Sequence, residues 1–251
     1  MPQPLSKVIK HGDGLSIVLG PIEEHQLRLG GLVARLISVC AFSDFHFGKL
    51  FIAMLGPQAA PAFSIYDAFA WSHPKTIALK AVAETVLNKD DFTIFLGILK
   101  LFSQDQKQRH KFAHWLWAYC PTLPDHIVLV DPIKLLRYQA ALAQVNMVNM
   151  PSGSATPVEI KMNEDTRQWL TNCECYSRDE MLRIIAQFTD TLILIDAFRQ
   201  ILTLVPKEPA AWPRARLISH PRLARAILHV EDQPEPVASQ TPPSEHPAQP
   251  E

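Results

Sequence analysis

The stretch Arg109-His110-Lys111-Phe112-Ala113-His114 places a guanidinium next to two imidazoles. Histidine can accept or release a proton near neutral pH, so both His110 and His114 could transfer protons. Arginine presents a fixed fork of N–H donors that matches phosphate oxygens, where negative charge builds up in a transition state. This combination therefore makes Arg109, His110 and His114 the candidate site residues of the chain.

Other interpretations of the same stretch stay open on sequence alone. Arg109 could pair with a carboxylate inside a helical bundle, and His114 could be a partly buried polar residue on a helix flank. The two histidines are one helical turn apart, a spacing that can bind zinc, but Lys111 stands where the metalloprotease motif H-E-x-x-H has its glutamate. We therefore expect no metal and no cofactor here. Similar Arg–His spacings at Arg214–His220 and Arg222–His229 show that the spacing alone is weak.

The surroundings of the motif are more specific than its spacing. We expect a long amphipathic helix from Phe92 to about Tyr119, with the motif near its end. Its apolar positions recur with the helical period, at Phe95, Ile98, Leu99, Phe102, Phe112, Ala113 and Leu116. Arg109 continues this stripe, and steps of four and three residues place His110, His114 and Trp117 on an adjacent stripe. The helix would thus hold the guanidinium at the edge of a packed face.

The same periodicity predicts the rest of a mainly α fold of four to five helices with a small two-stranded β insertion. The predicted helices run from Gly20-Pro21 to about Met54, from Ser64 to Leu87 with an interruption at His73-Pro74, from Asp131 to Gln144, and from Ser177 to Pro206. The last begins with a capping box, Ser177-Arg178-Asp179-Glu180. The two predicted strands are His126–Val130 and Val158–Met162.

Composition divides the chain into three parts. Residues 1–20 are expected to form an irregular N-terminal arm, in which Leu15–Leu19 could be a short extended piece. Residues 21–205 form the helical domain. Residues 206–251 are rich in proline and are expected to be largely disordered, with a short helix at most at Pro221–Val230, because such a segment has little to bury. A flexible proline-rich tail could dock a partner protein.

The motif and its helix resemble the signature of HEPN-like domains, and in detail those of bacterial members. That signature is an arginine, usually followed by a polar residue, with histidine four to six positions later. The resemblance covers roughly residues 21–205 and includes aromatic residues after the motif, at Trp115 and Trp117. It implies a helical bundle, often a homodimer, in which catalytic members cleave RNA without a metal. His114 would then transfer the proton, Arg109 would hold the phosphate, and His110 would orient the site or add a second imidazole.

The sequence departs from that family at two positions. In many bacterial members the pattern is Arg-Asn-x-x-Ala-His-Gly-x-Trp, whereas here His110 replaces the usual asparagine and Trp115 replaces the usual glycine. These departures bear on catalysis more than on fold. The alternative expectation is therefore a non-catalytic helical module for dimerisation or for binding another protein.

The bulk properties limit the class of protein. A net charge of −1 gives no global attraction to nucleic acid, so RNA or nucleotide binding would need a local patch. We expect a cytoplasmic protein without a membrane contact, because no signal segment opens the chain and because Arg35, Asp44 and Lys49 interrupt its longest apolar region. Cys173-Glu174-Cys175 has no second cysteine pair at zinc-site spacing.

Overall fold

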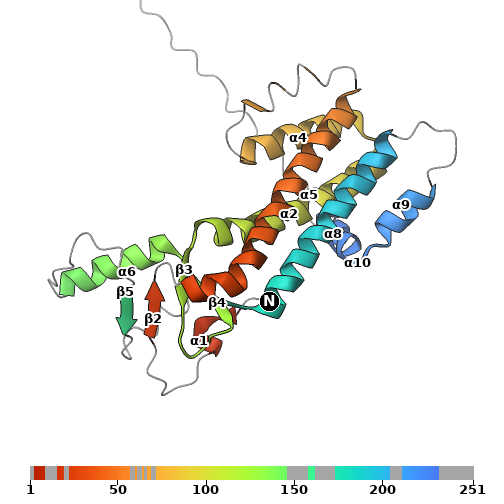
Figure 1. Ribbon diagram of the computed structural model, residues 1–251. Coiled ribbons are helices and arrows are strands. Elements are labelled where there is room, and N and C mark those ends of the chain that lie inside the picture. The colour runs from red at the N-terminus through yellow and green to blue at the C-terminus, as the bar shows by residue number, and fades with distance from the viewer. Residues whose placement is uncertain are drawn as a thin grey trace, which may run out of the picture.

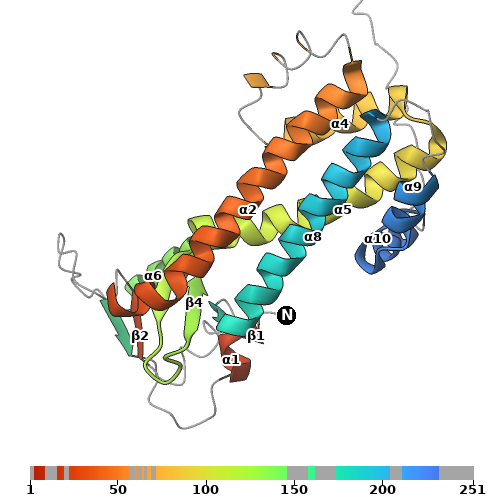
Figure 2. The ribbon, with the colours of Figure 1, turned by 45° about the vertical axis from the view of Figure 1, so that its right-hand side comes forward.

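Three long helices form the body of the protein in a computed structural model (Figure 1). It describes residues 3–8, 16–19, 23–56, 60, 64, 67–68, 72–145, 158–161, 173–203 and 211–231. The long helices are α2 (Glu23–Leu55), α5 (Lys89–His114) and α8 (Arg178–Thr203). Helices α2 and α8 lie side by side and run in the same direction, while α5 passes behind them in the opposite direction (Figures 1 and 2). The predicted mainly α class is confirmed.

The apolar faces of these helices meet in two successive clusters along the bundle. One cluster joins Phe47 and Phe51 of α2 to Phe95 of α5 and Phe198 of α8. The other joins the first half of α2 to Phe112 and to the first half of α8. Because the buried positions recur with the helical period, each helix contributes one continuous stripe to this core.

The start of α8 is capped as predicted. The backbone N–H of Ser177 donates to Oε2 of Glu180 at 3.0 Å, and the N–H of Glu180 donates to Oγ of Ser177 at 3.3 Å. These two reciprocal bonds satisfy amides that have no partner within the helix. The capping box therefore fixes the point at which the chain leaves the sheet and enters α8.

Helix α5 begins earlier than predicted. We expected its start at Phe92, whereas the helix starts at Lys89 because Asn88 caps it. The Oδ1 of Asn88 accepts from the N–H of Asp91 at 3.0 Å. Helix α4 (Ser72–Val86) likewise contains the Pro74 that we expected to interrupt it, since proline is tolerated in the first turn of a helix.

An antiparallel sheet lies at the end of the bundle where α5 stops and α8 starts (Figure 2). Its order is β1-β6-β4-β3-β2-β5. The strands are β1 (Gln3–Pro4), β2 (Ser16–Leu19), β3 (Leu116–Tyr119), β4 (His126–Val130), β5 (Val158–Lys161) and β6 (Cys173–Ser177). The predicted strands are β4 and β5, and the predicted helix between them is α6 (Pro132–Val145). These two strands do not pair with each other: β4 pairs with β3 and β6, and β5 pairs with β2.

Within residues 1–20 the structure describes residues 3–8 and 16–19, and both segments are ordered elements where we expected an irregular arm. The extended piece expected at Leu15–Leu19 corresponds to β2. Strand β1 pairs with β6, and β2 pairs with β3 and β5. The short helix α1 (Leu5–Val8) follows β1, and the side chain of Leu5 is fully buried against the sheet. These elements are only two to four residues long, so they show no periodicity in the sequence, and they form by pairing with the sheet or packing against it.

The domain also extends beyond the expected boundary at residue 205. Helices α9 (Ala211–Ile218) and α10 (Pro221–Glu231) pack on the bundle through the buried side chains of Leu217, Leu223 and Ala226. The assignment of 206–251 as a largely disordered tail is therefore wrong for residues 211–231, and the short helix predicted near Pro221 is confirmed as α10. Residues 232–251 lie outside the described part of the chain.

Helix α2 combines a buried face with apolar exposed positions. Within the described residues, its segment Leu29–Leu55 is the one stretch that is long and apolar enough to cross a membrane, judged by length and composition alone. Two of its polar side chains contact the neighbouring helices. Asp44 accepts a hydrogen bond from Gln106 of α5, and His46 lies next to Asp196 of α8.

Candidate functional site

The motif occupies the last turns of α5, at the junction between bundle and sheet. The helix ends at His114, because Trp115 is extended with ψ of 153° while its N–H still bonds to the carbonyl of Lys111. The predicted continuation to Tyr119 is therefore wrong, since strand β3 begins at Leu116. Trp117 lies in that strand and not on the histidine stripe, and its indole N–H donates to the carbonyl of Phe112 at 3.1 Å.

His110 and His114 come together on the exposed side of this last turn. Their ring centroids are 4.5 Å apart and the ring planes are tilted by 45°. Both residues are exposed. The predicted adjacency of the two imidazoles is thus present, and both rings are open to a ligand in solution.

Arg109 lies on a different side of the helix. At about 100° per residue, its direction differs from that of His110 by about 100° and from that of His114 by about 140°. It is partly buried next to α2, where its positive charge partly offsets the rise that burial causes in the pKa values of Asp44 and Cys40. Among the residues that the structure describes, Arg109 has no hydrogen bond and no ion pair within 4.0 Å.

Asp44 is a carboxylate whose pKa is affected by the charge of Arg109. Burial raises the pKa of Asp44 above its ordinary value, while the charges of Arg109 and Lys75 work in the opposite direction. Its Oδ1 accepts a hydrogen bond from the Nε2 of Gln106 at 2.8 Å. The sequence analysis noted Asp44 only as an interruption of an apolar region and did not predict it as a neighbour of Arg109. An acidic residue in a largely apolar helix was the signal that could have indicated such a role.

A second polar group fastens the end of α5 to strand β6. The Nζ of Lys111 lies 2.5 Å from Oε1 of Glu174, and the hydroxyl of Tyr176 donates to Oε2 of Glu174 at 2.5 Å. The ring of Tyr176 packs against Phe112, with centroids 4.7 Å apart. Lys111 is therefore engaged by a carboxylate, which leaves Arg109 as the motif cation without such a partner in the described residues.

Asp105, one turn before Arg109, faces the core. It is 7% exposed, its Oδ1 lies 3.4 Å from Nη2 of Arg222, and its Oδ2 has no hydrogen bond within the described structure. Burial raises the pKa of Asp105 to about 6, against the opposing effects of Thr191 and Arg222. Sequence reasoning did not single out Asp105, because its partner Arg222 comes from α10.

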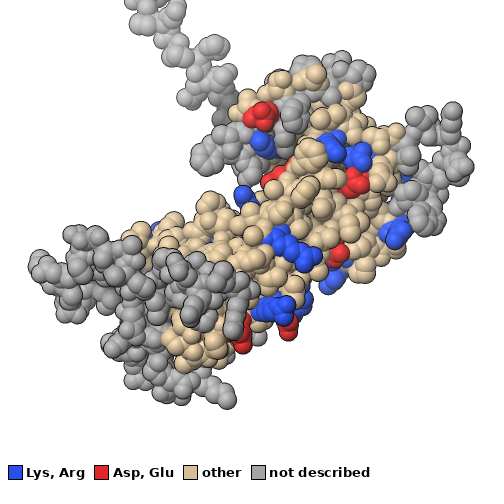
Figure 3. Space-filling model, in the orientation of Figure 1, with Lys and Arg blue, Asp and Glu red and all other residues tan. Residues whose placement is uncertain are grey.

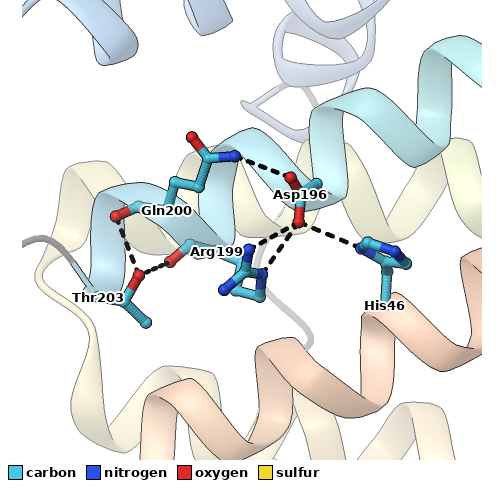
Figure 4. Close-up of polar contacts among 5 residues, drawn as sticks. All are labelled: His46, Asp196, Arg199, Gln200 and Thr203. Carbon is cyan, nitrogen blue, oxygen red and sulfur yellow. Dashed lines mark hydrogen bonds and ion pairs between the residues drawn. The ribbon is translucent and has the colours of Figure 1, made fainter.

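A third polar cluster clamps α2 to α8 (Figure 4). The side chains of His46, Arg199 and Gln200 converge on the carboxylate of Asp196. Nδ1 of His46 lies 3.2 Å from Oδ1, without hydrogen-bond alignment, whereas Arg199 donates to the same oxygen at 3.0 and 2.9 Å and Gln200 donates to Oδ2 at 2.8 Å. Burial would raise the pKa of Asp196, but the hydrogen bonds from Arg199 and Gln200 outweigh it and lower the pKa. The hydrogen bonds to both oxygens come from α8 itself, and His46 supplies the contact with α2.

Three of the cysteines have thiols with strongly raised pKa values. All four are buried and unpaired by disulfides. Burial raises the pKa of Cys40, Cys173 and Cys175 to about 12, so these thiols stay protonated near neutral pH. Within the described ranges no three histidine, cysteine, aspartate or glutamate side chains gather as a metal site.

The chain was compared with family models, with curated proteins and with solved structures. No family model, no curated protein and no solved structure matches the chain.

Proposed function

We propose that the protein is a HEPN-like RNA-cleaving or nucleotide-binding domain that works without a metal and uses Arg109, His110 and His114. The observation that supports this proposal most strongly is the state of Arg109, a partly buried guanidinium without a hydrogen-bond partner in the described structure. A cation in such a place favours an anionic ligand, and a phosphodiester is the anion that an arginine fork matches.

RNA carries its own nucleophile, so the proposed reaction needs only proton transfer and charge stabilisation. An imidazole takes the proton from the ribose 2′-hydroxyl as that oxygen bonds to phosphorus. The bond from phosphorus to the 5′ oxygen breaks, and the leaving oxygen takes up a proton. His114 is the proposed proton-transfer residue, His110 orients the site or supplies the second imidazole, and Arg109 binds the charged phosphate oxygens.

The proposal includes a homodimer of the chain. Because Arg109 and His114 leave the helix in directions about 140° apart, one chain alone presents them to different regions of space. A second copy would allow the arginine of one chain and the histidines of the other to reach one phosphate. The proposed partners are therefore a second copy of the chain and RNA or a nucleotide.

The test is an RNA cleavage assay in the presence of a chelator. We expect the purified chain to cleave single-stranded RNA under these conditions. His114→Ala should reduce the rate by about 10²- to 10⁴-fold, the contribution typical of a general acid or base. Arg109→Ala should reduce it by about 10²- to 10³-fold, as expected for loss of a charge-stabilising donor.

His229→Ala is the matched control, since His229 is also an exposed histidine near a helix end, on α10. It should cleave RNA at the wild-type rate. Cleavage that persists unchanged in His114→Ala would rule out the proposed role of that residue.

A non-catalytic interaction module is the second candidate, and a separate observation favours it. The face formed by α2 and α8 has uncharged stretches between scattered Lys and Arg side chains (Figure 3). Phe42 and Phe45 of α2 and Ile193 of α8 are each more than half exposed. Apolar side chains grouped on a surface commonly mark a protein contact. Self-association without any RNA cleavage would favour this candidate over the first.

A further inference from the structure

The exposed imidazoles of His110 and His114 lie close enough together to bind a single ion. The rings project from successive turns of one helix with their centroids 4.5 Å apart. Their backbone is held firmly, since Phe112 between them is buried in the core and Lys111 is fastened to Glu174 of β6. Two imidazoles that a rigid helix already holds close together can bind one ion with little loss of freedom.

We propose that His110 and His114 form a two-nitrogen binding site for a divalent transition-metal ion of the class of Zn²⁺, Ni²⁺ and Cu²⁺. Imidazole nitrogen suits these ions, whereas Mg²⁺ and Ca²⁺ prefer oxygen ligands. The site needs no other protein ligand than the two rings, and both are accessible from solution.

The number of ligands determines what kind of metal site this is. A structural zinc site is closed by four protein ligands. Among the described residues no third histidine, cysteine, aspartate or glutamate joins the pair, so water completes the coordination. The bound ion is therefore exchangeable, and its occupancy follows the concentration of free metal.

Occupancy of this site regulates the proposed RNA cleavage, and this part of the inference rests on that proposed function. A ring nitrogen that donates its lone pair to a metal cannot accept a proton from the ribose hydroxyl. The ion thus acts as an inhibitor of a reaction that itself needs no metal. Removing the ion with a chelator restores the free imidazoles.

Calorimetric titration of the full chain with ZnCl₂ and with NiCl₂ tests the site directly. We expect one ion per chain and no detectable heat with MgCl₂. His110→Ala and His114→Ala should each weaken binding on the order of a hundredfold, because the second nitrogen of a chelate binds at high effective concentration. His229→Ala should bind as the wild type does. Both ring variants are exposed, and circular dichroism checks that their fold is unchanged.

Zinc binding with the wild-type affinity in His110→Ala or in His114→Ala would overturn the proposed site. In the RNA assay, Zn²⁺ at saturating concentration should inhibit the wild type, and excess chelator should restore cleavage. Active protein that zinc saturates without inhibition would overturn the regulatory part. If the chain does not cleave RNA even with chelator present, the proposed function fails, and the calorimetric result still decides whether the metal site exists.

Discussion

The Nζ of Lys111 lies 2.5 Å from Oε1 of Glu174, a contact that joins the last turn of α5 to strand β6. The other carboxylate oxygen of Glu174 accepts from the hydroxyl of Tyr176. One carboxylate thereby binds a side chain from the helix and one from its own strand. Since this anchor lies inside the motif, it fixes the positions from which Arg109 and the two histidines project.

Glu174→Gln should destabilise the fold. The change removes the charge that pairs with Lys111 and one acceptor, and hydrogen bonds to charged groups are each worth about 1.5–3 kcal/mol. We expect the free energy of unfolding in urea to fall by about 1–3 kcal/mol. Lys111→Met should lose a similar amount, and the double variant should lose less than the sum of the two.

The control for this cycle is Glu84→Gln on α4. Glu84 is exposed and has no ion pair or hydrogen bond in the part of the chain that the structure describes, so its removal should leave stability unchanged. Strict additivity of the Lys111 and Glu174 variants would contradict the contact.

Asp105 makes stability depend on pH. Its pKa in the folded chain is about 6, raised by burial from the ordinary value of 3.8. Below about pH 4 the carboxyl is protonated in both the folded and the unfolded chain, and above about pH 6 it is charged in both, so folding then includes the cost of a buried charge. Relative to Asp105→Asn, the wild type should therefore lose up to about 3 kcal/mol of stability as pH rises through this window. Urea unfolding of both proteins at about pH 4.5 and about pH 7 measures the difference. An identical pH dependence of the two would refute it.

Gly97 is required for the docking of α10. A Cβ at this position would lie 2.9 Å from Cγ1 of Ile227 and 2.9 Å from Cδ1 of Leu223. Gly97→Leu should cost about 1–3 kcal/mol of stability through overpacking, and it should accelerate hydrogen exchange of the α10 amides. Gly31→Leu is the matched control, because a Cβ at Gly31 meets nothing within 4 Å. Unchanged exchange in α10 of the Gly97 variant would contradict the predicted contact.

The exposed phenylalanines of α2 predict self-association. Phe42 and Phe45 are 56% and 57% exposed on the same helix face. If this face binds a second copy, the double variant Phe42→Asp and Phe45→Asp should sediment as a monomer. Its thermal unfolding should remain cooperative, which shows that the monomer is still folded. Ile133→Asp on α6 is the control, since Ile133 is equally exposed but lies on another element. A mass that does not change with the α2 substitutions would exclude this face as the dimer contact.

The sequence by itself determined the long helices and where the motif falls on them. The apolar period of α5 and the capping box of α8 are local features, and local features act through backbone hydrogen bonds within a few residues. The neighbourhood of His110 and His114 follows for the same reason, because residues four apart in a helix are neighbours wherever that helix packs.

Contacts between distant segments decided the remainder. Leu116 to Tyr119 continue an apolar helical pattern, yet they form β3 because β4 and β2 offer pairing on both sides. Helices α9 and α10 bury their apolar side chains only against the bundle, and the ion pairs Arg214–Asp91 and Arg222–Asp105 join them to α5. The sequence also placed Arg109 on the core stripe. Only the tertiary structure decided that Lys111 forms an ion pair with Glu174, whereas Arg109 acts on Asp44 through its charge without an ion pair. The partner of a long charged side chain depends on which segments the fold brings beside it.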